Sequence, residues 1–121
     1  MDIHKSYYET LYTRPVVTLP GYSAKYQLPG TLYAYLAFGG ATGSAKDALA
    51  EGMLALAVEK GLLSQGQTVV EASSGSFGVA LAIACAHSHH PLVLCMPATV
   101  PVERQELLAK FGAKIVLSNY V

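Results

Sequence analysis

Hydrophobic and polar positions alternate in blocks along the second half of the chain. Three short apolar runs predict strands, and two longer segments between them have helical spacing. The predicted strands are Thr68–Glu71, Leu92–Met96 and Ile115–Leu117, and the predicted helices are Gly75–His87 and Val102–Phe111. Strands that are apolar almost throughout and that alternate with helices predict a parallel sheet covered on both faces. We therefore expect an α/β fold with three layers, in which helices flank the sheet on each side.

The first part of the chain has a less regular pattern. A further helix is predicted from Ala45 to Lys60, ending at Gly61, with apolar residues around most of its circumference. Thr31–Phe38 alternates loosely and predicts a strand. The residues before it are rich in proline and glycine, with one short strand around Val16–Leu19. We expect an N-terminal arm over residues 1–30 and an α/β domain over residues 31–121.

Composition narrows the classes of function. The 121 residues carry 8 basic and 8 acidic side chains, so the formal net charge is zero. A neutral chain lacks the positive field that holds a phosphate backbone, which argues against nucleic-acid binding. The longest apolar run, Phe77–Ala86, is too short to span a membrane, and no signal peptide is evident. Cys85 and Cys95 lie in apolar segments without a CxxC pair, which favours a reducing, cytoplasmic location.

A lysine stands at the predicted start of one helix. In Thr42-Gly43-Ser44-Ala45-Lys46-Asp47, the Ser-x-x-Asp pattern predicts that Ser44 caps the helix and that Asp47 lies in its first turn. The positive end of the helix dipole disfavours an ammonium group at Lys46, and burial would disfavour it further. A neutral amine is the nucleophile that imine chemistry requires, although first-turn lysines are more often solvated surface residues.

A serine- and glycine-rich loop follows the first strand of the regular half. Ser73-Ser74-Gly75-Ser76-Phe77-Gly78 connects the end of that strand to the next helix, where backbone N–H groups attract anions. A plain turn with a serine cap is the alternative. A dinucleotide-binding loop fits poorly, because the first glycine of GxGxxG is missing.

These two segments resemble motifs of the pyridoxal-phosphate (PLP) enzymes related to cysteine synthase, cystathionine β-synthase and the tryptophan synthase β subunit. Met96-Pro97-Ala98-Thr99 and Glu103-Arg104 extend the resemblance, which covers roughly residues 10–118. The resemblance implies that Lys46 binds PLP covalently and moves the substrate α-proton. It also implies that Ser73, Ser74, Gly75 and Phe77 lie at the substrate carboxylate, and that Ser76 lies at the cofactor.

This chain departs from the family's pattern at several positions in or near both motifs. The family has Asn and Thr where this chain has Ser76 and Phe77, and its charged residues near the lysine are replaced by Tyr35, Ala37 and Ala48. In the family, the loop that binds the PLP phosphate lies in the later half, so the resemblance covers the N-terminal portion only. Met1–Val121 is therefore expected to be a truncated form, inactive as an isolated chain.

The function implied by the resemblance is a lyase or transferase of cysteine biosynthesis, which performs β-elimination or β-replacement on a serine-derived amino acid. The alternative is a non-catalytic remnant that keeps the fold and works through protein contacts. A homodimer, or contact with a missing second domain, is expected. His87, His89 and His90 invite a metal interpretation, but no cysteine or carboxylate completes a ligand set, so we predict no metal site.

Overall fold

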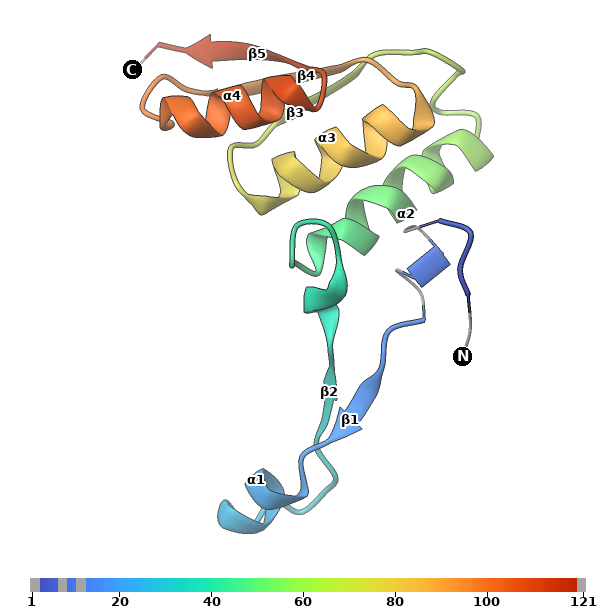
Figure 1. Ribbon diagram of the computed structural model, residues 1–121, viewed down its shortest axis with the longest axis vertical. Coiled ribbons are helices and arrows are strands. Elements are labelled where there is room, and N and C mark those ends of the chain that lie inside the picture. The colour runs from blue at the N-terminus through green and yellow to red at the C-terminus, as the bar shows by residue number, and fades with distance from the viewer. Residues whose placement is uncertain (1–2, 7–8, 11–12, 120–121) are drawn as a thin grey trace. The chain divides into compact units, whose positions relative to one another are not determined.

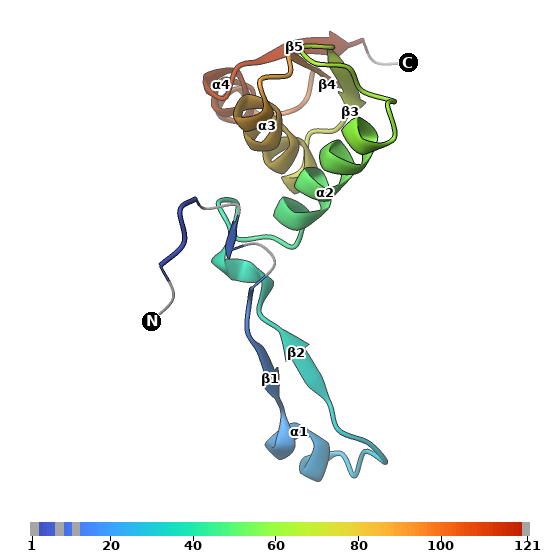
Figure 2. The ribbon, with the colours of Figure 1, turned by 90° about the vertical axis from the view of Figure 1, so that its right-hand side faces the viewer.

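The computed structural model describes residues 3–6, 9–10 and 13–119, and the chain divides into two compact units. The first unit is Met1–Ala45 and the second is Lys46–Val121. Figures 1 and 2 show the two units from directions 90° apart.

The first unit is built on a short antiparallel ribbon. Strand β1 (Val16–Thr18) pairs with β2 (Tyr33–Tyr35), and helix α1 (Pro20–Lys25) lies between them in sequence. A 3-10 helix, η2 (Ala37–Gly39), follows β2. The strand predicted near Val16 is confirmed. Because β2 pairs with β1, the ribbon includes residues on both sides of the boundary at residue 30 that was predicted between the arm and the α/β domain. Helix α1 was not predicted; Pro20 occupies its first turn, where a missing N–H costs nothing.

The second unit contains the regular pattern that the sequence predicts. Its elements are α2 (Lys46–Glu59), β3 (Val69–Ala72), α3 (Ser76–Ser88), β4 (Leu92–Pro97), α4 (Val102–Lys110) and β5 (Ala113–Ser118). The strands form a parallel sheet in the order β3-β4-β5 (Figure 1). The α/β class, the parallel sheet and all three predicted strands are therefore confirmed. Gly61 and Gly112, which follow α2 and α4, both have the positive φ that glycine tolerates best.

Burial alternates along the strands and separates the sheet into two faces. Leu92, Leu94 and Met96 of the central strand are at most 4% exposed, and they lie on the face covered by α3 and α4. On the opposite face, Val70 is 65% exposed and Val116 is 41% exposed. Among the described residues, helices thus cover one face only, and the second helical layer of the predicted three is not formed. The second face is nevertheless apolar, and that apolar character is why the sequence indicated cover on both sides.

Helix α2 packs against α3 through a narrow stripe. Ala50 and Leu54 are buried in that contact, whereas Leu49, Met53 and Leu56 remain 44% to 49% exposed. Burial on more than one side, which the apolar circumference predicted, is therefore not provided within the described part of the chain. No helix in that part is both long enough and apolar enough to cross a membrane.

Candidate functional site

The serine- and glycine-rich loop lies at the carboxyl edge of the sheet. It leaves β3 after Ala72 and enters α3 at Ser76. Gly75 takes the cap position with an extended backbone (φ −90°, ψ −162°), and no side chain caps this helix start. The first N–H groups of an α-helix have no partner within the helix, so they are donors for an anion placed beside the loop.

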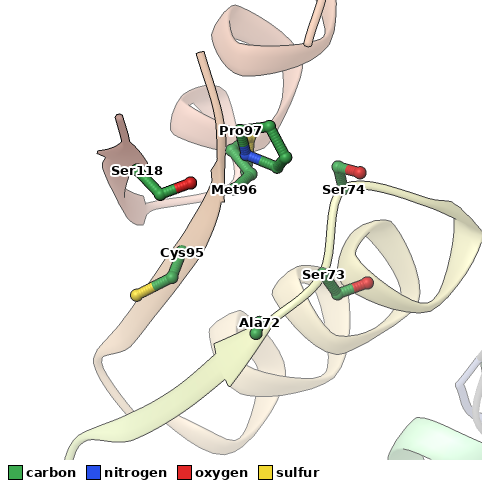
Figure 3. A pocket seen from close by; sticks show the side chains of 7 residues that line it. All are labelled: Ala72, Ser73, Ser74, Cys95, Met96, Pro97 and Ser118. Atoms are coloured by element: carbon green, nitrogen blue, oxygen red, sulfur yellow. The ribbon is translucent and has the colours of Figure 1, made fainter. Parts of the chain in front are cut away.

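The two serines of the loop turn their hydroxyls to one side. A hollow of about 270 Å³ is bounded by Ser73, Ser74 and residues that end the three strands: Ala72, Cys95, Met96, Pro97 and Ser118. In Figure 3, the hydroxyls of Ser73 and Ser74 point away from Cys95. The loop therefore presents mainly backbone and carbon atoms to the hollow, and its hydroxyl groups to the opposite side.

Lys46 is the first residue of α2, and its side chain is exposed. Helices α2 and α3 pack against each other, and both begin at the same end of the second unit (Figures 1 and 2). The end of α2 that carries Lys46 is therefore the same end as the start of α3, beside the serine loop. Because Lys46 is exposed, the described residues do not supply the burial expected for it.

The residues next to Lys46 form the start of α2 and the turn before it. Asp47, in the first turn of α2, is only 5% exposed. The helix begins one residue later than predicted, so Ala45 and not Ser44 directly precedes it. The N–H of Ser44 donates to Thr42 Oγ1 at 3.2 Å, which stabilises the turn before the helix.

Phe77 does not join the loop serines. Its side chain packs against the hydrophobic core and lines a second cavity, together with Met53 of α2 and Leu81 of α3. Ser76, in contrast, is exposed at the first position of α3. The structure thus groups Ser73, Ser74, Gly75 and Ser76 at one helix start and places Phe77 half-buried against the hydrophobic core.

The three histidines differ in position and burial. His87 is exposed in the last turn of α3, and His89 ends the helix in a left-handed conformation. His90 is buried, and its Nδ1 lies 3.1 Å from the Gln67 carbonyl oxygen. Within the described ranges, no group of three or more histidine, cysteine or acidic side chains is arranged to hold a metal ion.

Cys95 and Ser118 border the loop, although neither was singled out as a site residue from the sequence. Each lies near the carboxyl end of its strand, and the parallel register brings these strand ends to one edge. The available signal was positional, because parallel strands end at the edge where ligands bind. Cys85, in contrast, is buried, and burial raises the pKa of its thiol to about 11.

The second unit is a parallel α/β domain in which α3 starts without a side-chain cap at the edge of the sheet and α2, packed beside it, starts with a lysine. The family model described as "Pyridoxal-phosphate dependent enzyme" matches residues 9–120, and the chain belongs to this family. The predicted resemblance over residues 10–118 is thereby confirmed, as is PLP as the cofactor of the family.

Individual relatives agree with this assignment. A cysteine synthase of Staphylococcus aureus is 38% identical over 87 residues, which is 72% of this chain and 28% of that protein. O-ureido-L-serine synthase of Streptomyces lavendulae is 34% identical over 117 residues, covering 97% of this chain and 35% of the enzyme. The crystal structure of O-acetylserine sulfhydrylase isoform 3 from Entamoeba histolytica superimposes with a TM-score of 0.81 at 31% identity, over 98% of this chain and 36% of that one. The chain therefore spans about a third of the length of these relatives.

Proposed function

We propose that this chain is the lysine-bearing, carboxylate-binding portion of a cysteine synthase-like PLP enzyme. The proposed reaction is β-replacement or β-elimination on a serine-derived amino acid. One observation carries the proposal: α2, which starts at Lys46, and α3, which follows the Ser73–Gly75 loop, begin at the same end of one unit. A lysine and an anion-binding loop then face the same substrate region.

Each residue has a distinct role in this proposal. The hydroxyls of Ser73 and Ser74 and the N–H groups at the start of α3 bind the substrate carboxylate and orient the amino acid. Lys46 Nζ holds the cofactor and moves the proton at the substrate α-carbon. Ser76 contacts the cofactor ring. PLP, when bound, supplies the electron sink that makes the α-proton removable.

The residues present fit the substrate carboxylate and the aldehyde of the cofactor, but not the cofactor's phosphate. The uncapped start of α3 suits the substrate carboxylate, and the exposed Lys46 is accessible to the PLP aldehyde. The family resemblance assigns the phosphate-binding loop to a later segment, which corresponds to the two thirds of the relatives that this chain does not span. We infer that turnover requires that portion, and that the second unit contacts it or a second subunit.

A non-catalytic remnant is the second candidate. The packing of Phe77 into the core favours it, because the family has a hydrogen-bonding threonine at this position and this chain has an apolar side chain. In that case the fold persists as a binding module, and Lys46 is an ordinary surface lysine.

Trapping the cofactor distinguishes the two candidates. The purified chain is incubated with PLP, reduced with borohydride, and digested for peptide mapping by mass spectrometry. Lys60, exposed just beyond the opposite end of α2, supplies the matched control. The enzyme proposal expects Lys46 as the main labelled site, with labelling lost in Lys46→Ala and retained in Lys60→Ala. Equal labelling of both lysines would favour the remnant.

A further inference from the structure

Gly78 packs unusually tightly against the serine loop. It is the third residue of α3 and is buried. A Cβ atom added at this position would lie 3.0 Å from the carbonyl oxygen of Ser73 and 3.2 Å from its Oγ. Real Cβ atoms rarely approach other atoms this closely, so a side chain at residue 78 would force Ser73 to move by a few tenths of an ångström.

We propose that Gly78 is a positioning residue for the carboxylate loop. Without a side chain there, Ser73 can lie directly over the first turn of α3. The hydroxyl of Ser73 and the N–H groups of that turn then converge on one position. This inference rests on the proposed function, because it concerns how the same loop is aimed at a substrate carboxylate.

The conformation of Gly78 supports a steric role. Gly78 lies within a helix, and its φ is not among the positive values of this chain. Alanine would therefore fit the backbone and would stabilise an ordinary helix by about 0.5–1 kcal/mol relative to glycine. What glycine provides here is space for Ser73.

Gly52 in α2 offers a matched control. It is also a helical glycine, but an added Cβ would meet no atom within 4 Å. Gly52→Ala and Gly78→Ala therefore make the same chemical change in two helices, and only the second crowds the loop. We expect Gly52→Ala to keep or raise the melting temperature.

The experiment is an NMR titration of the full chain with L-serine, following the backbone amides of Ser74, Gly75 and Ser76. The wild-type and Gly52→Ala chains should bind with the same affinity. Gly78→Ala should bind about tenfold more weakly, which is the loss expected when one hydrogen bond to a charged group is removed. Equal affinity of a folded Gly78→Ala would overturn the inference and leave the proposed function standing. No response of these amides in the wild-type chain would count against the carboxylate site itself.

A double-mutant cycle covers the case in which Gly78→Ala does not fold. Ser73→Gly removes the crowded hydroxyl and lets the backbone at residue 73 rotate. We expect Gly78→Ala to lower the thermal midpoint in the Ser73 background and to lower it much less in the Ser73→Gly background. The same loss in both backgrounds would show that neither removing the Ser73 hydroxyl nor freeing its backbone relieves the crowding, and would overturn the inference that Gly78 positions this hydroxyl.

Discussion

Two adjacent leucines of α4 give a quantitative test of how this helix packs. Leu108 is fully buried against the core, whereas Leu107 is 41% exposed. Replacing either with alanine makes the same change in helix propensity, so the difference between the variants isolates burial. For Leu108→Ala, lost transfer free energy and the cavity left behind together cost about 3 kcal/mol.

Leu107→Ala should cost much less. About three fifths of this side chain is covered, its environment can relax toward solvent, and the expected loss is about 1 kcal/mol. The variants should therefore differ by about 2 kcal/mol. For a unit of this size, a urea m-value of about 1 kcal/mol/M converts that into a difference of about 2 M in unfolding midpoint.

Urea titration followed by far-UV circular dichroism measures both variants beside the wild-type chain. The m-values should be equal, so that the midpoints report stability and not a change in the unfolded state. Equal losses from the two substitutions, or a larger loss from Leu107→Ala, would refute the packing of α4 described above.

Two further predictions concern titratable groups. Burial raises the pKa of Glu51, an effect that His87 partly offsets, and one Glu51 oxygen is buried without a hydrogen bond. The folded chain therefore binds the Glu51 proton more tightly than the unfolded chain does. Protonated Glu51 stabilises the fold below pH 4.5, and this stabilisation is lost as the pH rises through the raised pKa. Glu51→Gln should raise the thermal midpoint at pH 7 and not at pH 4. Glu106→Gln, at an exposed position in the middle of α4, should change neither. A stabilisation by Glu51→Gln that is the same at both pH values would contradict this prediction. Burial raises the pKa of the Cys85 thiol from 9.0 to about 11, which lowers its thiolate population about a hundredfold. Iodoacetamide at pH 8 should therefore label Cys95 well before the buried Cys85, as followed by mass spectrometry. Similar labelling rates in the folded chain would refute the burial of Cys85.

The sequence predicted the regular half of the fold well because each element there has a strong local signal. The apolar run Leu92–Met96 and the helix that ends before Gly112 could be placed without tertiary information. Helix α1 could not, because six residues with two prolines nearby carry no helical period. Cover on the second sheet face was predicted from apolar residues such as Val70, but a pattern of this kind indicates only that a surface is apolar and does not identify what packs on it.

The candidate site was predicted only in part. Ser73 to Gly75 could be placed at the strand-to-helix turn, since serine and glycine are typical of such turns. The tight contact between Ser73 and Gly78 could not be predicted, because it depends on how closely the loop folds back over the helix. Phe77 was assigned by its neighbours in the motif, whereas its side chain packs according to its size and apolarity.

The shared starting end of α2 and α3 has an electrostatic consequence. The start of α3 carries about half a positive elementary charge from its peptide groups, and its first turn holds no acidic residue, whereas Asp47 lies in the first turn of α2. This attraction is built into the backbone of a chain whose formal net charge is zero. Because peptide groups do not titrate, the attraction of an anion to the start of α3 should weaken with added salt and change little with pH.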